Sequence, residues 1–341
     1  MTPVQSALTA LVGSGLSGCP ADRSMLTGLS ATDWESLYTL AKQHTVTGLL
    51  YGGLQLLPDG TGIPEDILLR LVSRIGKVAN HGKSMRNLTV ALTDYFSSKG
   101  LHPVVMKGIE SAAFYPDPDL RLYGDVDLYF TPDEFERAAN VAEKRFGKLR
   151  RDPDGSLHFK VDNIDIDIHR DYFGLHVKPE LLPDVPSPEA TLLMLSAHIL
   201  HHAIASGIGL RQITDLAAAY QALDGQYDPA QLEDIYRRTG LLKWNRLLSS
   251  YIQKHLGVNT PLADGQASKS LSRIIFSGGN FGHYASSRQK VLHASSFRRK
   301  LNTAGQFLRR LPFSLRVSPR ETILSILSLG KENLRTCKNN L

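Results

Sequence analysis

The sequence of 341 residues has only two cysteines, and it has no apolar run long enough to cross a membrane. Cys19 and Cys337 lie near opposite ends of the chain, which excludes a scaffold held by disulfides and a zinc site built on closely spaced cysteines. A membrane-spanning helix needs about 20 consecutive apolar residues. The apolar start of the chain also lacks the basic residues that precede the apolar part of a signal peptide. We therefore expect a protein of a reducing compartment, the cytoplasm, with no transmembrane segment.

Charge is distributed unevenly along the chain. The formal net charge is +6 overall, whereas residues 288–341 alone carry +10 and residues 1–287 carry −4. In this basic C-terminal segment, Phe297, Leu301 and Phe307 are interspersed among arginines and lysines, which is typical of an amphipathic helix. We expect the basic C-terminal segment either to pack on the body of the protein or to bind an acidic partner, such as RNA or an anionic membrane.

The spacing of apolar residues divides the chain into helical and strand-forming parts. We expect an N-terminal helical lobe over residues 1–100 and an α/β core over residues 101–186. A second helical lobe follows over residues 187–257, and residues 258–341 are predicted to form a linker and basic C-terminal helices. The fold class predicted from this order is α+β, with a small sheet flanked by helical lobes.

Two sequences typical of helix N-termini mark predicted helix starts. Thr131 followed by Glu134 forms one capping box, and Ser318 followed by Glu321 forms another, each with proline at the first helical position. By contrast, residues 258–287 are rich in glycine, serine and alanine, and this composition predicts a loop or linker.

Two short runs alternate between carboxylates and apolar residues, as strands with one polar face do. Asp125 and Asp127 share one face of the first predicted strand, about 6–7 Å apart. Asp165, Asp167 and His169 share one face of the second. Carboxylates this close repel each other unless a cation lies between them, and Mg²⁺ takes oxygen ligands. A solvated acidic face is the alternative, but four aspartates on nearby strands favour a metal site.

Lys107 and Gly108 end a short apolar strand and precede a predicted helix. A glycine at this junction lets backbone N–H groups approach a phosphate at the helix N-terminus. A simple turn at Gly108 is the alternative.

The order of these motifs resembles that of a known family. The matching residues are Lys107-Gly108, Arg121, Gly124-Asp125-Val126-Asp127-Leu128 and Ile166-Asp167-Ile168-His169. They are similar to the nucleotidyltransferase superfamily related to DNA polymerase β, and more narrowly to the bacterial uncharacterised nucleotidyltransferase family, over about residues 35–225. The resemblance implies an α+β fold with a small nucleotidyltransferase-type mixed sheet. It also implies transfer of NMP from an NTP, with ATP expected, to an unidentified small molecule, peptide or protein, with release of pyrophosphate.

The same resemblance implies roles for individual residues. Asp125 and Asp127 would hold two metal ions, Mg²⁺ with Mn²⁺ as a substitute, and Asp167 would be the third carboxylate, nearest the acceptor oxygen. Gly108 would contact the triphosphate through its backbone. Lys107 stands at a loop where the superfamily usually has Gly-Ser, so its charge would replace a serine hydroxyl. Asp165, on the same face as Asp167, is the alternative third ligand.

Arginine and histidine residues near these motifs have less specific roles. Arg121 is predicted either to bind phosphate, to brace the aspartates, or to form a structural ion pair. His169 is expected to contact nucleotide or acceptor, or to support the site through hydrogen bonds. Arg211 and Asp215 lie four residues apart, which predicts an ion pair within one helix.

Three further histidines, His198, His201 and His202, lie at helical spacing. This spacing invites a zinc site, but no HExxH glutamate and no fourth ligand accompany it. We therefore favour partly buried helix histidines.

Two other functions remain open from the sequence. One is a non-catalytic module of the same fold that binds nucleotide, nucleic acid or a partner. The other is a metal-dependent phosphodiesterase that uses the same carboxylates and needs no NTP.

Overall fold

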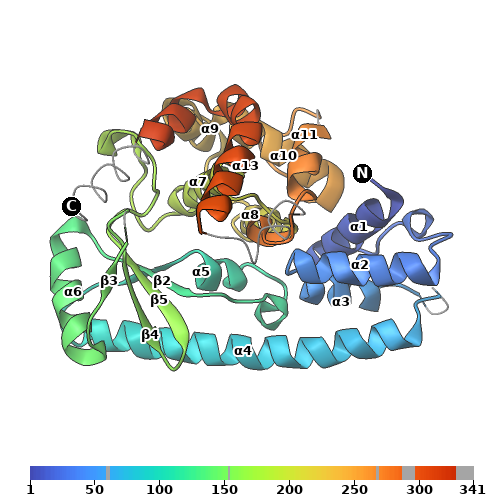
Figure 1. The fold of residues 1–341 in the computed structure, drawn as a ribbon, viewed down its shortest axis with the longest axis horizontal. Coiled ribbons are helices and arrows are strands. Elements are labelled where there is room, and N and C mark those ends of the chain that lie inside the picture. Colours follow the sequence, from blue (N-terminus) through green and yellow to red (C-terminus); the bar gives the residue numbers. More distant parts are fainter. Residues whose placement is uncertain (59–61, 153, 266–268, 286–295, 328–341) are drawn as a thin grey trace.

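Helices make up most of the molecule, and one small sheet lies at one end of it (Figure 1). The computed structural model describes the chain apart from five short segments, residues 59–61, 153, 266–268, 286–295 and 328–341. Part of the basic C-terminal segment therefore lies outside the described residues. Within the described part of the chain, no helix is both long and apolar enough to cross a lipid bilayer.

The N-terminal part consists of three packed helices. They are α1 (Pro3–Ser17), α2 (Ala31–Gln43) and α3 (Thr47–Gln55). α1 and α3 cross closely because glycines stand at their contact: a Cβ on Gly15 would overlap the carbonyl oxygen of Leu49, and one on Gly53 would overlap that of Leu11. This close crossing places the apolar faces of both helices in the larger hydrophobic core.

One long helix, α4 (Glu65–Ser97), connects the N-terminal helices to the sheet. Its 33 residues span about 50 Å, and it runs along the bottom of the molecule in Figure 1. Its first half buries Ile67 and Leu71 in the larger core, and its second half buries Met85 and Phe96 in a smaller core beneath the sheet. Both cores therefore share α4.

The sheet has five strands in the order β1-β2-β5-β4-β3. The strands are β1 (Val104–Met106), β2 (Val126–Tyr129), β3 (Arg150–Arg151), β4 (Leu157–Val161) and β5 (Ile164–His169). β2 and β5 are parallel, and the other neighbours are antiparallel. The parallel register sets Asp127 opposite Asp167 and Tyr129 opposite His169. A mixed sheet among helices confirms the predicted α+β fold class.

The two faces of the sheet differ in the way that the alternation predicts. Val126, Leu128, Ile166 and Ile168 are fully buried on one face. They pack in the smaller core against the second half of α4 and against α6 (Pro132–Phe146). Because side chains alternate along a strand, the carboxylates take the opposite face, toward the helices that follow the sheet.

The C-terminal half of the molecule is helical and shares the larger core with the N-terminal helices. Its helices are α7 (Pro188–Ala205), α8 (Leu210–Ala222), α9 (Pro229–Arg238), α10 (Leu242–Leu256), α11 (Lys269–Ile275) and α13 (Ser296–Val317), followed by a helical segment over residues 319–327. α5 (Gly108–Ala113) lies between β1 and β2 in the sequence. The predicted division into four parts remains a prediction.

The predicted loop over residues 258–287 is wrong at α11. This helix buries Leu271 and Ile275 completely, four residues apart on one face. The surrounding glycines and serines conceal that short apolar pattern in the sequence.

α13, within the basic C-terminal segment, packs on α7. Arg310 donates a hydrogen bond to the Ala205 carbonyl at 3.1 Å, and Val317 is buried in the larger core. Leu308 remains 63 % exposed on the outer side. The described part of α13 is thus a helix packed on the body, and binding of an acidic partner by the basic C-terminal segment stays a prediction.

Neither predicted capping box forms. Thr131 is at the N-cap of α6 but caps no backbone group with its side chain, because Glu134 instead accepts hydrogen bonds from the backbone and ring of His102. Ser318 Oγ is buried without a partner among the described residues. Glu321 turns toward His176 and away from its own helix start. In both cases a tertiary contact outcompetes the local one.

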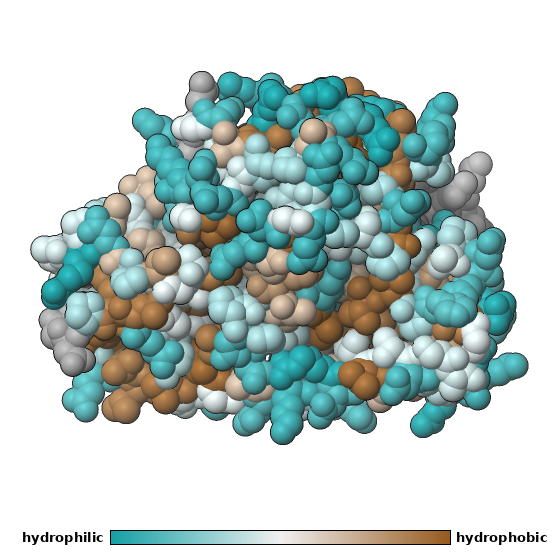
Figure 2. All heavy atoms as spheres, turned by 180° about the vertical axis from the view of Figure 1, so that it is seen from behind, coloured by the Kyte–Doolittle hydropathy of each residue, from teal (hydrophilic) through white to brown (hydrophobic). Residues whose placement is uncertain are grey.

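Apolar atoms gather over the N-terminal end of α4 on the face seen in Figure 2. The exposed apolar residues of that stretch include Leu68, Leu69 and Val72. This end of α4 lies away from the sheet (Figure 1). The apolar strip is therefore separate from the acidic face of the sheet.

Candidate functional site

The polar face of the sheet brings an acidic cluster together where the sheet faces α7 and α8. Parallel pairing of β2 and β5 sets Asp127 beside Asp167, and His169 ends β5 two residues later. One donor atom from each of these three residues lies within 4.8 Å of the other two. Asp127 is buried, while Asp167 and His169 are partly exposed. Within the described residues, this is the cluster that could hold a metal ion.

Lys107 supplies a positive charge to this cluster. Its Nζ lies 2.7 Å from Asp127 Oδ1 and 3.1 Å from His169 Nε2, and that ring nitrogen lies 2.7 Å from the same carboxylate oxygen. The backbone of Lys107 has a φ of +55°, in the region that favours glycine. Such a conformation costs about 1–3 kcal/mol and persists where the surrounding structure requires it. The fold therefore holds this lysine in place at the cluster.

The carboxylates of the cluster differ in their affinity for protons. Burial by itself would raise the pKa of Asp127, but Lys107 and His169 outweigh burial and hold that pKa well below its usual range. Burial, followed by repulsion from Asp127, raises the pKa of Asp125 to about 6. Asp125 nevertheless remains accessible to solvent where it lines the cavity. Asp152 and Asp154 line the same cavity as Asp125, Asp127 and Asp167, so the carboxylates there outnumber the Lys107 ammonium group and leave excess negative charge.

His158 of β4 separates the two candidates for the third carboxylate. Its Nδ1 lies 2.7 Å from Asp167 Oδ1, and its Nε2 lies 3.1 Å from Asp165 Oδ1. Asp165 also pairs with Lys160 at 2.9 Å and is 43 % exposed. Asp165 thus faces the neighbouring strand β4, whereas Asp167 faces Asp127.

Asp125 immediately precedes β2, so it lies one residue outside the strand that was predicted to include it, and it is not part of the three-residue cluster. Asp125 and Asp127 line one cavity of about 270 Å³ together with Gly108 and Asp167. We call this cavity the sheet cavity. It contains every sequence-predicted site residue except Asp165.

Gly108 borders the sheet cavity at the start of α5. A Cβ there would lie 3.4 Å from Arg121 Nη1, so any larger residue would press on that guanidinium. The glycine therefore leaves room for the arginine behind it.

Arg121 is engaged in a buried ion pair with the helical side of the molecule. Its Nε and Nη2 both lie 2.8 Å from the carboxylate of Asp215, which also accepts a hydrogen bond from Tyr115 at 2.7 Å. The predicted ion pair between Arg211 and Asp215 is therefore wrong, because Asp215 binds Arg121 instead. Of the alternatives for Arg121, the structural ion pair is the one that the structure contains.

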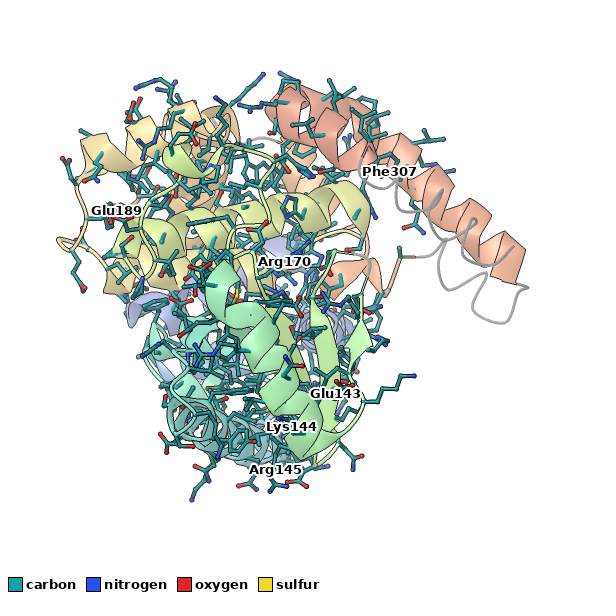
Figure 3. The ribbon with its side chains drawn as sticks, turned by 90° about the vertical axis from the view of Figure 1, so that its left-hand side faces the viewer. Glu143, Lys144, Arg145, Arg170, Glu189 and Phe307 are labelled. Atoms are coloured by element: carbon teal, nitrogen blue, oxygen red, sulfur yellow. The ribbon has the colours of Figure 1, made fainter. Side chains whose placement is uncertain are left out.

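A second cavity, of about 450 Å³, adjoins the sheet cavity and shares five lining residues with it, namely Lys107, Asp154, Ser156, His169 and His198. We call it the outer cavity. Arg170, labelled in Figure 3, lies where the sheet meets the helical layer and lines the outer cavity. Tyr172 and Phe173 add aromatic surface to the same cavity.

The helical segment over residues 319–327 supports the wall of the outer cavity, because its Glu321 contacts two residues that line the cavity. Glu321 is 3 % exposed, and its Oε1 accepts hydrogen bonds from His176 at 2.6 Å and from His201 at 3.3 Å. Burial alone would raise the pKa of Glu321, but the hydrogen bonds from His201 and His176 lower it. No sequence signal paired these residues, because they lie more than a hundred positions apart.

The histidines of α7 are partly buried, as predicted. The His198 and His202 rings pack edge to face with centroids 4.4 Å apart, and burial lowers the pKa of His202 to about 3. His201 instead contacts Glu321. These histidines are therefore packing and cavity-wall groups.

Arg211, at the start of α8, also lines the sheet cavity. The sequence spacing assigned it to Asp215, so its place opposite the aspartates was missed. A charged residue at a helix start carries no local signal for such a position.

Comparison with known proteins places these residues in a wider group. A family model described as an uncharacterised nucleotidyltransferase matches residues 30–257. The matched part includes the whole sheet, Lys107 and Arg211, and it ends before Glu321. No curated protein and no solved structure matches the chain.

Proposed function

The chain belongs to the uncharacterised nucleotidyltransferase family, and from this premise we propose that it transfers NMP from an NTP to an acceptor hydroxyl. Pyrophosphate is the second product. The observation that carries the proposal is the cluster of Asp127, Asp167 and His169 donor atoms within 4.8 Å of one another. These residues line a cavity that also contains an unbalanced carboxylate, Asp125.

The donor set fits a hard divalent cation. Mg²⁺ favours carboxylate oxygens, and the Lys107 ammonium already lies 2.7 Å from Asp127 as a positive charge at the same carboxylate. We propose that Asp125 and Asp127 hold two Mg²⁺ ions and that Asp167 is the third carboxylate, with Mn²⁺ as a substitute. When bound, the ions would neutralise phosphate charge and activate the acceptor oxygen.

Asp167 is the group that accepts the proton of the acceptor hydroxyl. One of its oxygens is held by His158 at 2.7 Å, which fixes the carboxylate without using both oxygens. In the reaction a bond forms between the acceptor oxygen and the α-phosphorus, and the bond from that phosphorus to the bridging oxygen breaks. The electron pair leaves with pyrophosphate, and the proton goes to Asp167.

The two cavities divide the substrates between them. The sheet cavity contains Gly108 and the aspartates, and we assign it to the NTP. The outer cavity meets it at the five residues that line both cavities, and we assign the outer cavity to the acceptor. This assignment places the acceptor hydroxyl next to the α-phosphate at the boundary between the cavities.

Activity is tested with purified protein, Mg²⁺ or Mn²⁺, each of the four α-labelled NTPs and a cell extract as the source of acceptor. We expect a labelled product and pyrophosphate release, with ATP as the preferred donor. Asp127→Asn should lower the rate about 10²–10³-fold, the range seen when one charge-stabilising group is removed. Asp133→Asn, on the exposed start of α6, is the matched control and should keep full activity.

Absence of product with every nucleotide and both metals would contradict the proposal. Product formation from phosphodiesters without added NTP would indicate a phosphodiesterase instead. Binding of RNA or DNA without Mg²⁺ and without any affinity for NTP would indicate a non-catalytic module.

A further inference from the structure

Arg211 points a guanidinium into the sheet cavity without a counterion at contact distance. Its Nη1 donates to the Leu122 carbonyl at 3.3 Å, and its guanidinium lies 5.3 Å from the centre of the Phe281 ring. Both of these partners are neutral. Its Nε is buried and has no hydrogen-bond partner among the described residues.

The nearest charges leave the position of Arg211 electropositive. Arg121 and Asp215 neutralise each other in their ion pair, and within the described part of the chain no carboxylate lies within 4.0 Å of Arg211. Burial, followed by repulsion from Arg121, lowers the pKa of Arg211. Asp125 and Asp215 attract it only at longer range. The helical wall of the sheet cavity is therefore cationic, whereas the sheet wall is acidic.

A buried cation with unused donors destabilises the unliganded protein. The cost is offset when a ligand brings an anion with several oxygens, because the guanidinium fork matches phosphate geometry. We propose that Arg211 binds the β- and γ-phosphates of the nucleotide and neutralises the pyrophosphate as it leaves. This inference rests on the proposed function and names a contact that the family resemblance does not include.

The position of Arg211 relative to the two cavities explains why it would bind the β- and γ-phosphates and not the α-phosphate. The transferred α-phosphate must lie where both cavities meet, beside Lys107, His169 and His198. Arg211 lines the sheet cavity but not the outer cavity. It therefore faces the part of the phosphate chain that does not move to the acceptor.

The phosphate chain would then lie between opposite walls. The aspartates would hold the metal that neutralises it on the sheet side, and Arg211 would bind it from α8. A bound nucleotide would thereby connect the sheet to the helical half of the molecule. Phe281 packs against the guanidinium and keeps it directed into the sheet cavity.

Calorimetry with three probes tests the assignment, namely ATP, pyrophosphate and AMP, each with Mg²⁺. We expect Arg211→Gln to weaken binding of ATP and pyrophosphate about 10- to 100-fold, the effect of losing a charge-assisted contact. AMP affinity should change less than about twofold, because AMP has no β- or γ-phosphate. Arg211→Lys keeps a point charge and should lose less than about tenfold.

Arg238→Gln is the matched control, because it removes the same charge from an exposed position on α9 that lines neither cavity. It should bind all three probes like the wild type. Thermal unfolding supplies a second readout: without ligand, Arg211→Gln should melt at the same or a higher temperature than the wild type, since a buried unpaired charge is removed.

The outcomes separate this inference from the proposed function. Wild-type protein that binds neither ATP nor pyrophosphate would overturn both. Wild-type binding with an equally tight Arg211→Gln variant would overturn only the role of Arg211. An equal loss of AMP affinity would move the contact to the α-phosphate or sugar. A lower melting temperature without ligand, together with unchanged ATP affinity, would make Arg211 a purely structural residue.

Discussion

The sheet wall and the helical wall face the same cavity, but different kinds of sequence information determine them. In the sheet wall, strand alternation and parallel pairing place Asp127 and Asp167 on one face, and Asp125 lines the same cavity from just before β2. The helical wall combines Arg121 and Asp215, which are 94 positions apart, with Arg211. The two-residue alternation of a strand can therefore predict an acidic face from the sequence. The cationic wall opposite it depends on how elements that are distant in the sequence pack together.

If the helical wall depends on long-range pairing, breaking its ion pair should have the largest effect on stability. Asp215→Asn leaves Arg121 buried without a counterion, and we expect a loss of about 3–5 kcal/mol of unfolding free energy. Replacing both Arg121 and Asp215 by leucine should restore much of this loss, because no buried charge remains. Urea unfolding measures both variants.

Glu35→Gln is the matched control for that experiment. It breaks the pair of Glu35 with Arg70, whose side chains are 47 % and 43 % exposed. An exposed pair contributes less than about 1 kcal/mol. A loss for Asp215→Asn no larger than that of this control would mean that the buried pair does not hold the helical wall in place.

A contact between α5 and α7, next to the sheet cavity, should make stability depend on pH. Glu110 of α5 accepts a hydrogen bond from Thr191 of α7 at 2.7 Å, and burial raises the pKa of Glu110 from 4.5 to about 7. The folded state therefore retains a proton that the unfolded chain loses above pH 4.5. The contribution of this group is most favourable below pH 4.5 and falls as the pH rises to about 7, by up to about 3 kcal/mol.

Glu110→Gln should remove this pH dependence. The variant is expected to be more stable than the wild type at pH 8, with the difference shrinking as the pH is lowered to 4. Urea midpoints across this pH range measure it. A difference that does not change with pH would show that the carboxyl of Glu110 ionises as it does in the unfolded chain.

The sequence predicts those parts of the site in which the interacting residues lie close together along the chain. Alternation correctly set Val126 and Ile166 in the core and Asp127 on the opposite face. The parallel pairing of β2 with β5 was not predicted, because no local pattern encodes which strands are neighbours.

Capping and i,i+4 rules failed where a tertiary partner was stronger. Glu321 accepts hydrogen bonds from two histidines, and Asp215 forms an ion pair with Arg121. Neither residue makes the local contact that was expected of it. Residues in a charged cavity wall are selected for distant partners, so local rules are least reliable there. Composition also concealed α11, in which only Leu271, Ile274 and Ile275 pack on the core.

The smallest effect is expected for one of two neighbouring carboxylates on strand β5, Asp165, when its substitution is compared with that of Asp167. Asp165 and Asp167 share a strand face and contact the same His158, so the sequence pattern does not rank them. Asp165 is paired with Lys160 and lines neither cavity, whereas Asp167 lines the sheet cavity beside Asp127. Asp165→Asn should therefore change the rate of NMP transfer by less than about twofold, while Asp167→Asn should match the loss of about 10²–10³-fold expected of Asp127→Asn. Initial rates with α-labelled ATP measure both variants. Equal losses of rate for the two would mean that both aspartates contribute equally to the reaction. Strand register alone would then not select the third carboxylate.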